Sequence, residues 1–110
     1  MKIPFNVNLT GKTAIVTGGS GTLCSAMAYG LAVSGAKTAI IGRNKANMEK
    51  VVNELTSNAL KEHNAAVTIK GYCSDVTDKE ELTKTYEAIK AELGSCDILI
   101  NGAGGNQLVP

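Results

Sequence analysis

The sequence has few of the features that mark membrane, secreted and nucleic-acid-binding proteins. No apolar run reaches the roughly 18 residues that a membrane span needs. Residues 1–9 contain one lysine and no apolar segment of the kind found in secretory signals. The formal net charge is only +1, so no basic field favours nucleic acid or a membrane surface. We therefore expect a cytoplasmic protein with neither a nucleic-acid nor a membrane partner.

Cysteine and histidine are also scarce, which argues against a disulfide framework and a metal centre. The three cysteines, Cys24, Cys73 and Cys96, are odd in number and form no C-x-x-C pair. Reduced thiols are the simplest interpretation. The single histidine, His63, lies in a polar stretch with no second ligand candidate beside it. No metal site is predicted.

The chain of 110 residues, 44% apolar and 19% charged, has the size and composition of one small globular domain. Short apolar segments alternate with helical stretches, and this βαβαβαβ order predicts an α/β fold with a parallel sheet and helices on both faces. Right-handed crossovers give the strand order 3-2-1-4. The predicted strands are Thr13–Thr17, Thr38–Gly42, Val67–Tyr72 and Asp97–Asn101, and the predicted helices are Thr22–Ser34, Lys45–Glu62 and Asp78–Leu93.

Local signals support these helices. Gly35 stands where a helix C-terminal glycine belongs, and Thr77–Glu80 is typical of a capping box that opens the third helix. Tyr86 and Lys90 have Y-x-x-x-K spacing, but Tyr86 falls on the apolar stripe of its helix and is interpreted as a core residue. The predicted buried faces are Met48, Val51, Val52 and Leu55 on the second helix, and Leu82, Tyr86, Ile89 and Leu93 on the third.

The fourth predicted strand bears on domain organisation. Its apolar run Ile98–Ile100 is typical of a central strand, yet only residues 102–110 follow it. A central strand left at an edge is an aggregation hazard. We therefore expect residues 1–110 to be the N-terminal part of a larger, doubly wound Rossmann-type domain.

The most informative segment is residues 17–24, Thr-Gly-Gly-Ser-Gly-Thr-Leu-Cys, between the first strand and the first helix. In this setting glycines let the backbone approach a pyrophosphate, which the N–H groups of the helix N-terminus then bind. The pattern Gly19-x-Gly21-x-x-Cys24 departs from G-x-G-x-x-G, with a small cysteine where Gly or Ala packs helix against strand. An ordinary strand-to-helix turn is the alternative.

The end of the second strand bears on the choice between NAD and NADP. NAD sites usually place Asp or Glu there to accept hydrogen bonds from the ribose, whereas this chain has Gly42-Arg43-Asn44. The planar guanidinium of Arg43 can hold a 2′-phosphate. NADP is therefore the preferred cofactor and NAD the second choice, the alternative being a solvated arginine.

Two further segments follow strands at the same edge. Asp75-Val76 comes after the third strand, where the carboxylate can accept from the amine of an adenine and the valine can pack on the ring; plain turn chemistry is the alternative. Residues 101–106, Asn-Gly-Ala-Gly-Gly-Asn, follow the fourth strand, where ligands of open α/β sheets bind. A flexible loop is the alternative there.

Together these elements resemble the short-chain dehydrogenase/reductase family. The family's first motif, T-G-x-x-x-G-x-G, matches at Thr17 and Gly18, while its later two glycines fall on Thr22 and Cys24. Asp75-Val76 is similar to its adenine-site pair.

The family's N-N-A-G motif is similar to residues 101–104, with Gly102 in place of the second asparagine. A narrower likeness, to the D-mannonate oxidoreductase (fructuronate reductase) branch, rests on the opening Ile3-Pro4-Phe5, the loop at 17–24 and the run at 101–106. This likeness implies reduction of a keto-sugar acid of the D-fructuronate/D-mannonate type.

The resemblance implies an NAD(P)-dependent oxidoreductase that transfers hydride between nicotinamide and a small carbonyl or hydroxyl substrate, and a homo-oligomer when intact. The family's catalytic Ser, Tyr and Lys lie on later elements, so no catalytic residue is predicted here. A nucleotide-sensing module without chemistry is the competing function. The predicted cofactor-binding residues are Gly18, Gly19, Ser20, Gly21, Thr22, Leu23, Arg43, Asn44, Asp75, Val76, Asn101, Gly102, Ala103 and Gly104.

Overall fold

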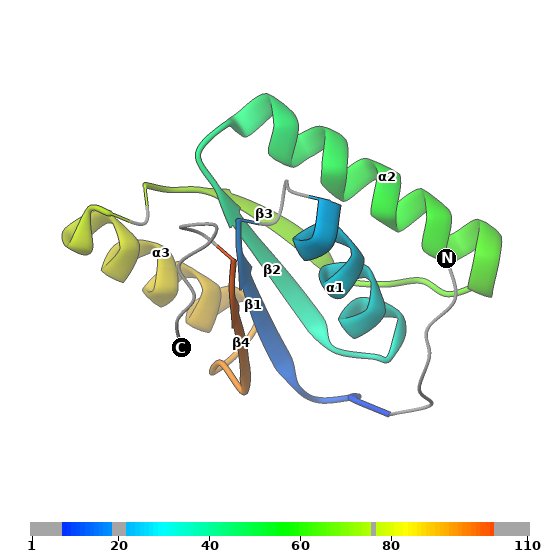
Figure 1. Cartoon of the computed structure of the whole chain (residues 1–110). Helices are drawn as coiled ribbons and strands as arrows, with labels where there is room; N and C mark the ends of the chain where they lie inside the picture. The colour runs from blue at the N-terminus through cyan, green and yellow to red at the C-terminus, as the bar shows by residue number, and fades with distance from the viewer. Residues whose placement is uncertain (1–7, 19–21, 76, 103–110) are drawn as a thin grey trace.

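The computed structural model describes residues 8–18, 22–75 and 77–102, in which four strands alternate with three helices (Figure 1). All strand pairs are parallel, and the sheet order is β3-β2-β1-β4. Both the α/β class and the predicted order 3-2-1-4 are therefore confirmed. The elements are β1 (Thr13–Thr17), α1 (Thr22–Val33), β2 (Lys37–Gly42), α2 (Lys45–His63), β3 (Ile69–Cys73), α3 (Lys79–Glu92) and β4 (Ile98–Asn101).

The sheet separates two apolar clusters, with α1 and α2 on one face and α3 on the other (Figure 1). Successive side chains of a strand point to opposite faces. Val16 and Ile40 therefore join the cluster under α1 and α2, while Ile15 and Ile41 join the one under α3. β1 and the central part of β2 are buried on both sides.

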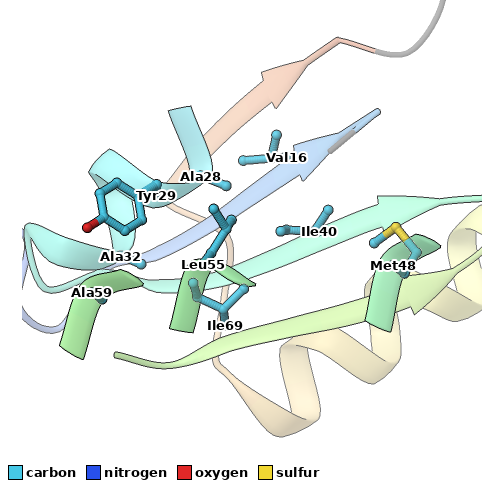
Figure 2. Close-up of a cluster of buried hydrophobic side chains, with 9 residues drawn as sticks. All are labelled: Val16, Ala28, Tyr29, Ala32, Ile40, Met48, Leu55, Ala59 and Ile69. Atoms are coloured by element: carbon cyan, nitrogen blue, oxygen red, sulfur yellow. The ribbon is translucent and has the colours of Figure 1, made fainter. Parts of the chain in front are cut away.

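The larger cluster lies between the sheet and the two helices α1 and α2 (Figure 2). Met48 and Leu55 of α2 point into it, and Val51 and Val52 pack against it, as the periodicity of that helix predicts. Tyr29 of α1 is 1% exposed, and its hydroxyl donates to Glu62 of α2 at 2.5 Å. This hydrogen bond satisfies the one polar atom of a ring that packs in the apolar cluster.

The face under α3 holds Ile89 and Leu93 in its core, with Leu82 and Tyr86 packed at its margin, which confirms the predicted stripe. Burial raises the pKa of Tyr86. A phenol that is to act as a proton donor next to a lysine needs a lowered pKa. The interpretation of Tyr86 as a core residue is therefore supported.

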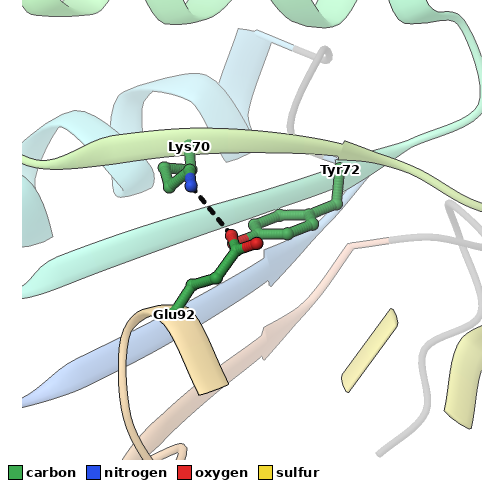
Figure 3. A network of polar contacts seen from close by, with 3 residues as sticks. All are labelled: Lys70, Tyr72 and Glu92. Carbon is green, nitrogen blue, oxygen red and sulfur yellow. Dashed lines mark hydrogen bonds and ion pairs between the residues drawn. The ribbon is translucent and has the colours of Figure 1, made fainter. Parts of the chain in front are cut away.

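A polar network ties the edge strand β3 to α3 (Figure 3). Glu92 pairs with Lys70 at 2.8 Å and accepts from the Tyr72 hydroxyl at 2.5 Å. Hydrogen bonds from Lys70 and then Tyr72 lower the pKa of Glu92, and burial followed by the bond to Glu92 raises the pKa of Tyr72. Charged side chains along an edge strand also discourage pairing with another chain.

β3 begins and ends later than predicted, at Ile69 rather than Val67 and at Cys73 rather than Tyr72. The ladder with β2 starts at the pair Thr38–Ile69 and ends at Gly42–Cys73. Val67 is half-buried and packs against the larger core cluster without joining the ladder. Val67 is therefore apolar because it packs against the core, and not because it pairs with β2.

The capping box at the start of α3 was predicted one residue too early. The N-cap is Asp78, whose carboxylate accepts from the Glu81 N–H at 3.1 Å. Thr77 instead donates through its hydroxyl to Asp75, and Glu81 accepts from the Asp75 N–H. The capping role therefore belongs to Asp78, while Thr77 contributes to the preceding turn.

Gly35 confirms the predicted end of the first helix. It has φ +110°, a conformation that favours glycine, and its N–H donates to Ala32 O at 3.0 Å. A Cβ there would lie 2.8 Å from Thr10 Oγ1. The glycine therefore also lets the segment before β1 pack closely.

The described residues contain no helix that is both long and apolar enough to cross a membrane. They also contain no group of three or more His, Cys, Asp and Glu side chains that could hold a metal ion. His63 is exposed at the end of α2, with its ring centroid 5.9 Å from that of Tyr29.

Candidate cofactor site

The carboxyl ends of the four strands meet at one edge of the sheet. The register pairs Thr17 with Asn101 and with Ile41, and Gly42 with Cys73. The residues that follow these strands therefore lie along the same edge. In open α/β sheets this edge is where ligands bind.

Gly18 turns the chain out of the sheet. Its N–H still donates to Ile41 O at 2.9 Å, and its φ of +75° then redirects the backbone toward α1. Thr22 and Leu23 are the first residues of that helix. Its first turn contains no acidic residue, so no carboxylate competes with an anion for the N–H groups there. This arrangement suits a phosphate group.

Six of the predicted site residues lie outside the described ranges: Gly19, Ser20, Gly21, Val76, Ala103 and Gly104. The remaining eight all lie at the carboxyl edge. They are Gly18, Thr22, Leu23, Arg43, Asn44, Asp75, Asn101 and Gly102.

The end of β4 is joined to the end of β1. The Thr17 hydroxyl donates to Asn101 Oδ1 at 2.9 Å, and the Gly102 N–H donates to Thr17 O at 3.0 Å. Asn101 therefore holds two strands together, while its side chain remains exposed. Local sequence does not predict this role of Thr17, because the partner is 84 residues away and only the strand order brings the two together.

Arg43 and Asn44 connect β2 to α2. Arg43 is exposed, and its positive charge is the smallest of the causes that lower the pKa of Asp75. Asn44 is the N-cap of α2, and its side-chain oxygen accepts from the Asn47 N–H at 3.0 Å. Asn44 thus has a local structural role besides the predicted one, and an Asn before a helix is the usual sequence signal for this role.

Asp75 has the turn role, which is one of the two roles that the sequence left open. One carboxylate oxygen accepts from the Thr77 hydroxyl at 2.6 Å and from its N–H at 2.9 Å, which is turn chemistry. These bonds are the main cause of the lowered pKa of Asp75. The group is therefore ionised near neutral pH, when a carboxylate only accepts hydrogen bonds. It faces the edge at which Arg43 also lies.

Gly42 leaves the space for a buried side chain. A Cβ at this position would lie 2.5 Å from Met48 Sδ of α2. Position 42, where an NAD site would have an acidic residue, is therefore also in close packing contact with α2. Any replacement of Gly42 requires the flexible Met48 side chain to move.

The model of the short chain dehydrogenase family matches residues 12–110 of the chain. The chain belongs to the short-chain dehydrogenase family. The resemblance seen in its motifs is thereby confirmed.

Three relatives show how this family member compares with others. The uncharacterized oxidoreductase UxuB of Bacillus subtilis (strain 168) is 46% identical over 104 residues, which are 94% of this chain and 35% of UxuB. A candidate D-mannonate oxidoreductase from Haemophilus influenza, solved with bound NAD, has a TM-score of 0.78 at 36% identity, covering 91% of this chain and 33% of that protein. The L-sorbose reductase of Gluconobacter frateurii, complexed with NADPH and L-sorbose, has a TM-score of 0.78 at 26% identity, covering 91% and 36%.

The chain thus spans about a third of the length of the curated relatives it matches, 35% of each of the first two. The solved relatives are covered to a similar share. The matching third contains the sheet edge described above.

Proposed function

We propose that this chain is the cofactor-binding part of an NAD(P)-dependent oxidoreductase. The observation that carries the proposal is the meeting of Gly18, the N-terminus of α1, Asp75 and Asn101 at one sheet edge. The positive φ of Gly18 and the absence of acidic residues in the first turn of α1 fit a pyrophosphate. NAD and NADPH in two solved relatives support a nicotinamide cofactor.

Different residues at this edge are suited to different groups of the cofactor. The backbone at Gly18 and the start of α1 is suited to the pyrophosphate, and Asp75 to the amine of the adenine. Arg43 is suited to a 2′-phosphate, and NADP is therefore the proposed preference. Bound at this edge, the nicotinamide supplies or accepts a hydride at a carbonyl or hydroxyl carbon of the substrate.

The substrate that we propose is a keto-sugar acid of the D-fructuronate/D-mannonate type. The likeness to the candidate D-mannonate oxidoreductase supports this class. The chemistry itself requires a proton donor, which we assign to none of the described residues, since Tyr86 is half-buried with a raised pKa. We further propose that residues 1–110 form one nucleotide-binding segment of a larger domain, because Leu99 of β4 is 54% exposed. The homo-oligomeric state and the cytoplasmic location stay predictions.

The test is a titration of NADPH into the 110-residue chain, followed by nucleotide fluorescence, with Arg43→Gln beside it. The matched control is Lys37→Gln, which removes a cation at the opposite end of the same strand, β2. A charged hydrogen bond contributes about 1.5–3 kcal/mol, so Arg43→Gln is expected to weaken NADPH binding about ten- to a hundredfold while Lys37→Gln does not. No saturable binding of NADPH or NADH by the unmodified chain would refute the proposed function.

A further inference from the structure

Gly102 approaches the first helix more closely than any other residue type could. It follows β4 directly, and its N–H donates to Thr17 O. A Cβ at this position would lie 2.1 Å from Cys24 Sγ and 3.0 Å from Thr17 O. Side-chain carbons do not approach sulfur this closely, so the Cys24 thiol occupies the space that a side chain at position 102 would need.

Cys24 lies in the first turn of α1, where the helix meets the carboxyl edge of the sheet. It is half-buried and packs against the larger core cluster. The thiol therefore lies between the start of α1 and the end of β4.

Both positions also depart from the family pattern, and the two departures change side-chain size in opposite directions. Cys24 is larger than the glycine that the pattern has there, and Gly102 is smaller than its asparagine. The structure shows that these departures fall on the two sides of one contact. A larger side chain on the helix is matched by a missing one at the residue that follows the strand.

We propose that Cys24 and Gly102 are a complementary pair that positions the first turn of α1 over the end of β4. The thiol fills the space left by Gly102, and Gly102 in turn leaves the thiol room. Neither residue needs to touch the cofactor. They act on its binding by setting the position of the phosphate-facing backbone, and this part of the inference rests on the proposed function.

A double-mutant cycle tests the pair in the 110-residue chain, with the unfolding midpoint and the dissociation constant of NADPH as readouts. Gly102→Ala is expected to lower the midpoint by about 4–8 °C or more and to weaken NADPH binding about tenfold. Adding Cys24→Ala removes the sulfur and leaves the two β-carbons 3.7 Å apart, an ordinary contact. The double variant is therefore expected to regain most of both losses, short of the remaining approach to Thr17 O.

The matched control combines Gly102→Ala with Cys96→Ala, a cysteine that is exposed and precedes β4. This control is expected to regain nothing. Additive effects of Gly102→Ala and Cys24→Ala, or equal recovery with Cys96→Ala, would overturn the proposal. If Gly102→Ala alone abolishes cooperative unfolding, its return in the Cys24→Ala double variant supports the pair, and its absence there refutes it. If the unmodified chain binds no NADPH, the proposed function fails and the unfolding midpoints alone decide on the pair.

Discussion

The hydroxyl of Thr17 donates to the side-chain oxygen of Asn101 at 2.9 Å, which joins the ends of the neighbouring strands β1 and β4. A comparable bond closes the other end of β1, where the Thr13 hydroxyl donates to Leu93 O at 2.9 Å. Each end of this strand thus has a threonine hydroxyl bonded to another element, one at the proposed cofactor edge and one away from it. The two can be compared directly.

We expect Thr17→Val and Thr13→Val each to lower the free energy of unfolding by about 0.5–1.5 kcal/mol, the usual net contribution of one hydrogen bond. Only Thr17→Val is expected to weaken NADPH binding, because only its partner lies at the carboxyl edge. Urea unfolding and NADPH titration of both variants measure the two effects. Equal affinities for NADPH would show that the Thr17–Asn101 bond has a purely structural role.

Two glycines near the end of α1 should respond to alanine in opposite directions. Gly30 lies within the helix, and a Cβ there would meet nothing within 4 Å, so Gly30→Ala is expected to stabilise the protein by about 0.5–1 kcal/mol. Gly35 has φ +110° and Thr10 Oγ1 in the way, so Gly35→Ala is expected to cost about 1–2 kcal/mol or more. Thermal unfolding measures both. A stabilising Gly35→Ala would contradict the helix end described here.

All three tyrosines have raised pKa values, mainly because of burial. The pKa of Tyr29 is raised to about 12, with hydrogen bonding to Glu62 as a further cause. Burial raises the pKa of Tyr72, and its hydrogen bond to Glu92 adds to this effect. The tyrosinate absorbance step of the folded chain should therefore lie at higher pH than that of the chain unfolded in urea, in which all three tyrosines ionise near pH 10.

The sign of the pH effect on stability follows from the same shifts. A raised folded pKa gives a stabilising contribution that is complete below pH 10 and is lost as the pH rises through the folded value, about 12 for Tyr29. Unfolding midpoints should therefore fall between pH 10 and pH 12, and less steeply in Tyr29→Phe. A midpoint independent of pH over this interval would contradict the burial of Tyr29.

The sequence predicted the fold well because local signals and packing agreed. β1 has the predicted bounds, and each of the other elements differs by one or two residues at one end or at both. The errors arose where a residue had two uses: Val67 packs without pairing, and Thr77 serves the turn and leaves the cap to Asp78. Each is a competition that composition alone does not decide.

The candidate site was predicted less completely, for a different reason. The residue types at Gly18, Arg43, Asp75 and Asn101 are enough to mark these positions as candidates from the sequence alone. The contact between Cys24 and Gly102 was not foreseen, because it depends on the distance between a helix and a strand. Such distances follow from the packing of the whole sheet and are not visible in local sequence.

The end of β2 permits a test of the choice between NADP and NAD. Gly42→Asp with Arg43→Leu places a carboxylate where an NAD site has one and removes the cation proposed to bind the 2′-phosphate. The 2′-phosphate carries close to two negative charges near neutral pH, so the carboxylate repels it. We expect the ratio of NADPH to NADH affinity to fall about ten- to a hundredfold, as a charged hydrogen bond contributes about 1.5–3 kcal/mol.

The close contact of Gly42 with Met48 requires its own control, because a Cβ at position 42 would lie 2.5 Å from Met48 Sδ. Gly42→Ala adds this Cβ without a charge and retains Arg43. If Met48 is displaced in Gly42→Ala, the binding of NADPH and of NADH should be weakened equally, and the ratio of the two affinities should stay unchanged. Titration of NADPH and NADH into the three proteins at one ionic strength separates the two effects. If the unmodified chain binds NADH more tightly, or the double variant leaves the ratio unchanged, Arg43 is a solvated surface residue and the proposed preference for NADP is wrong.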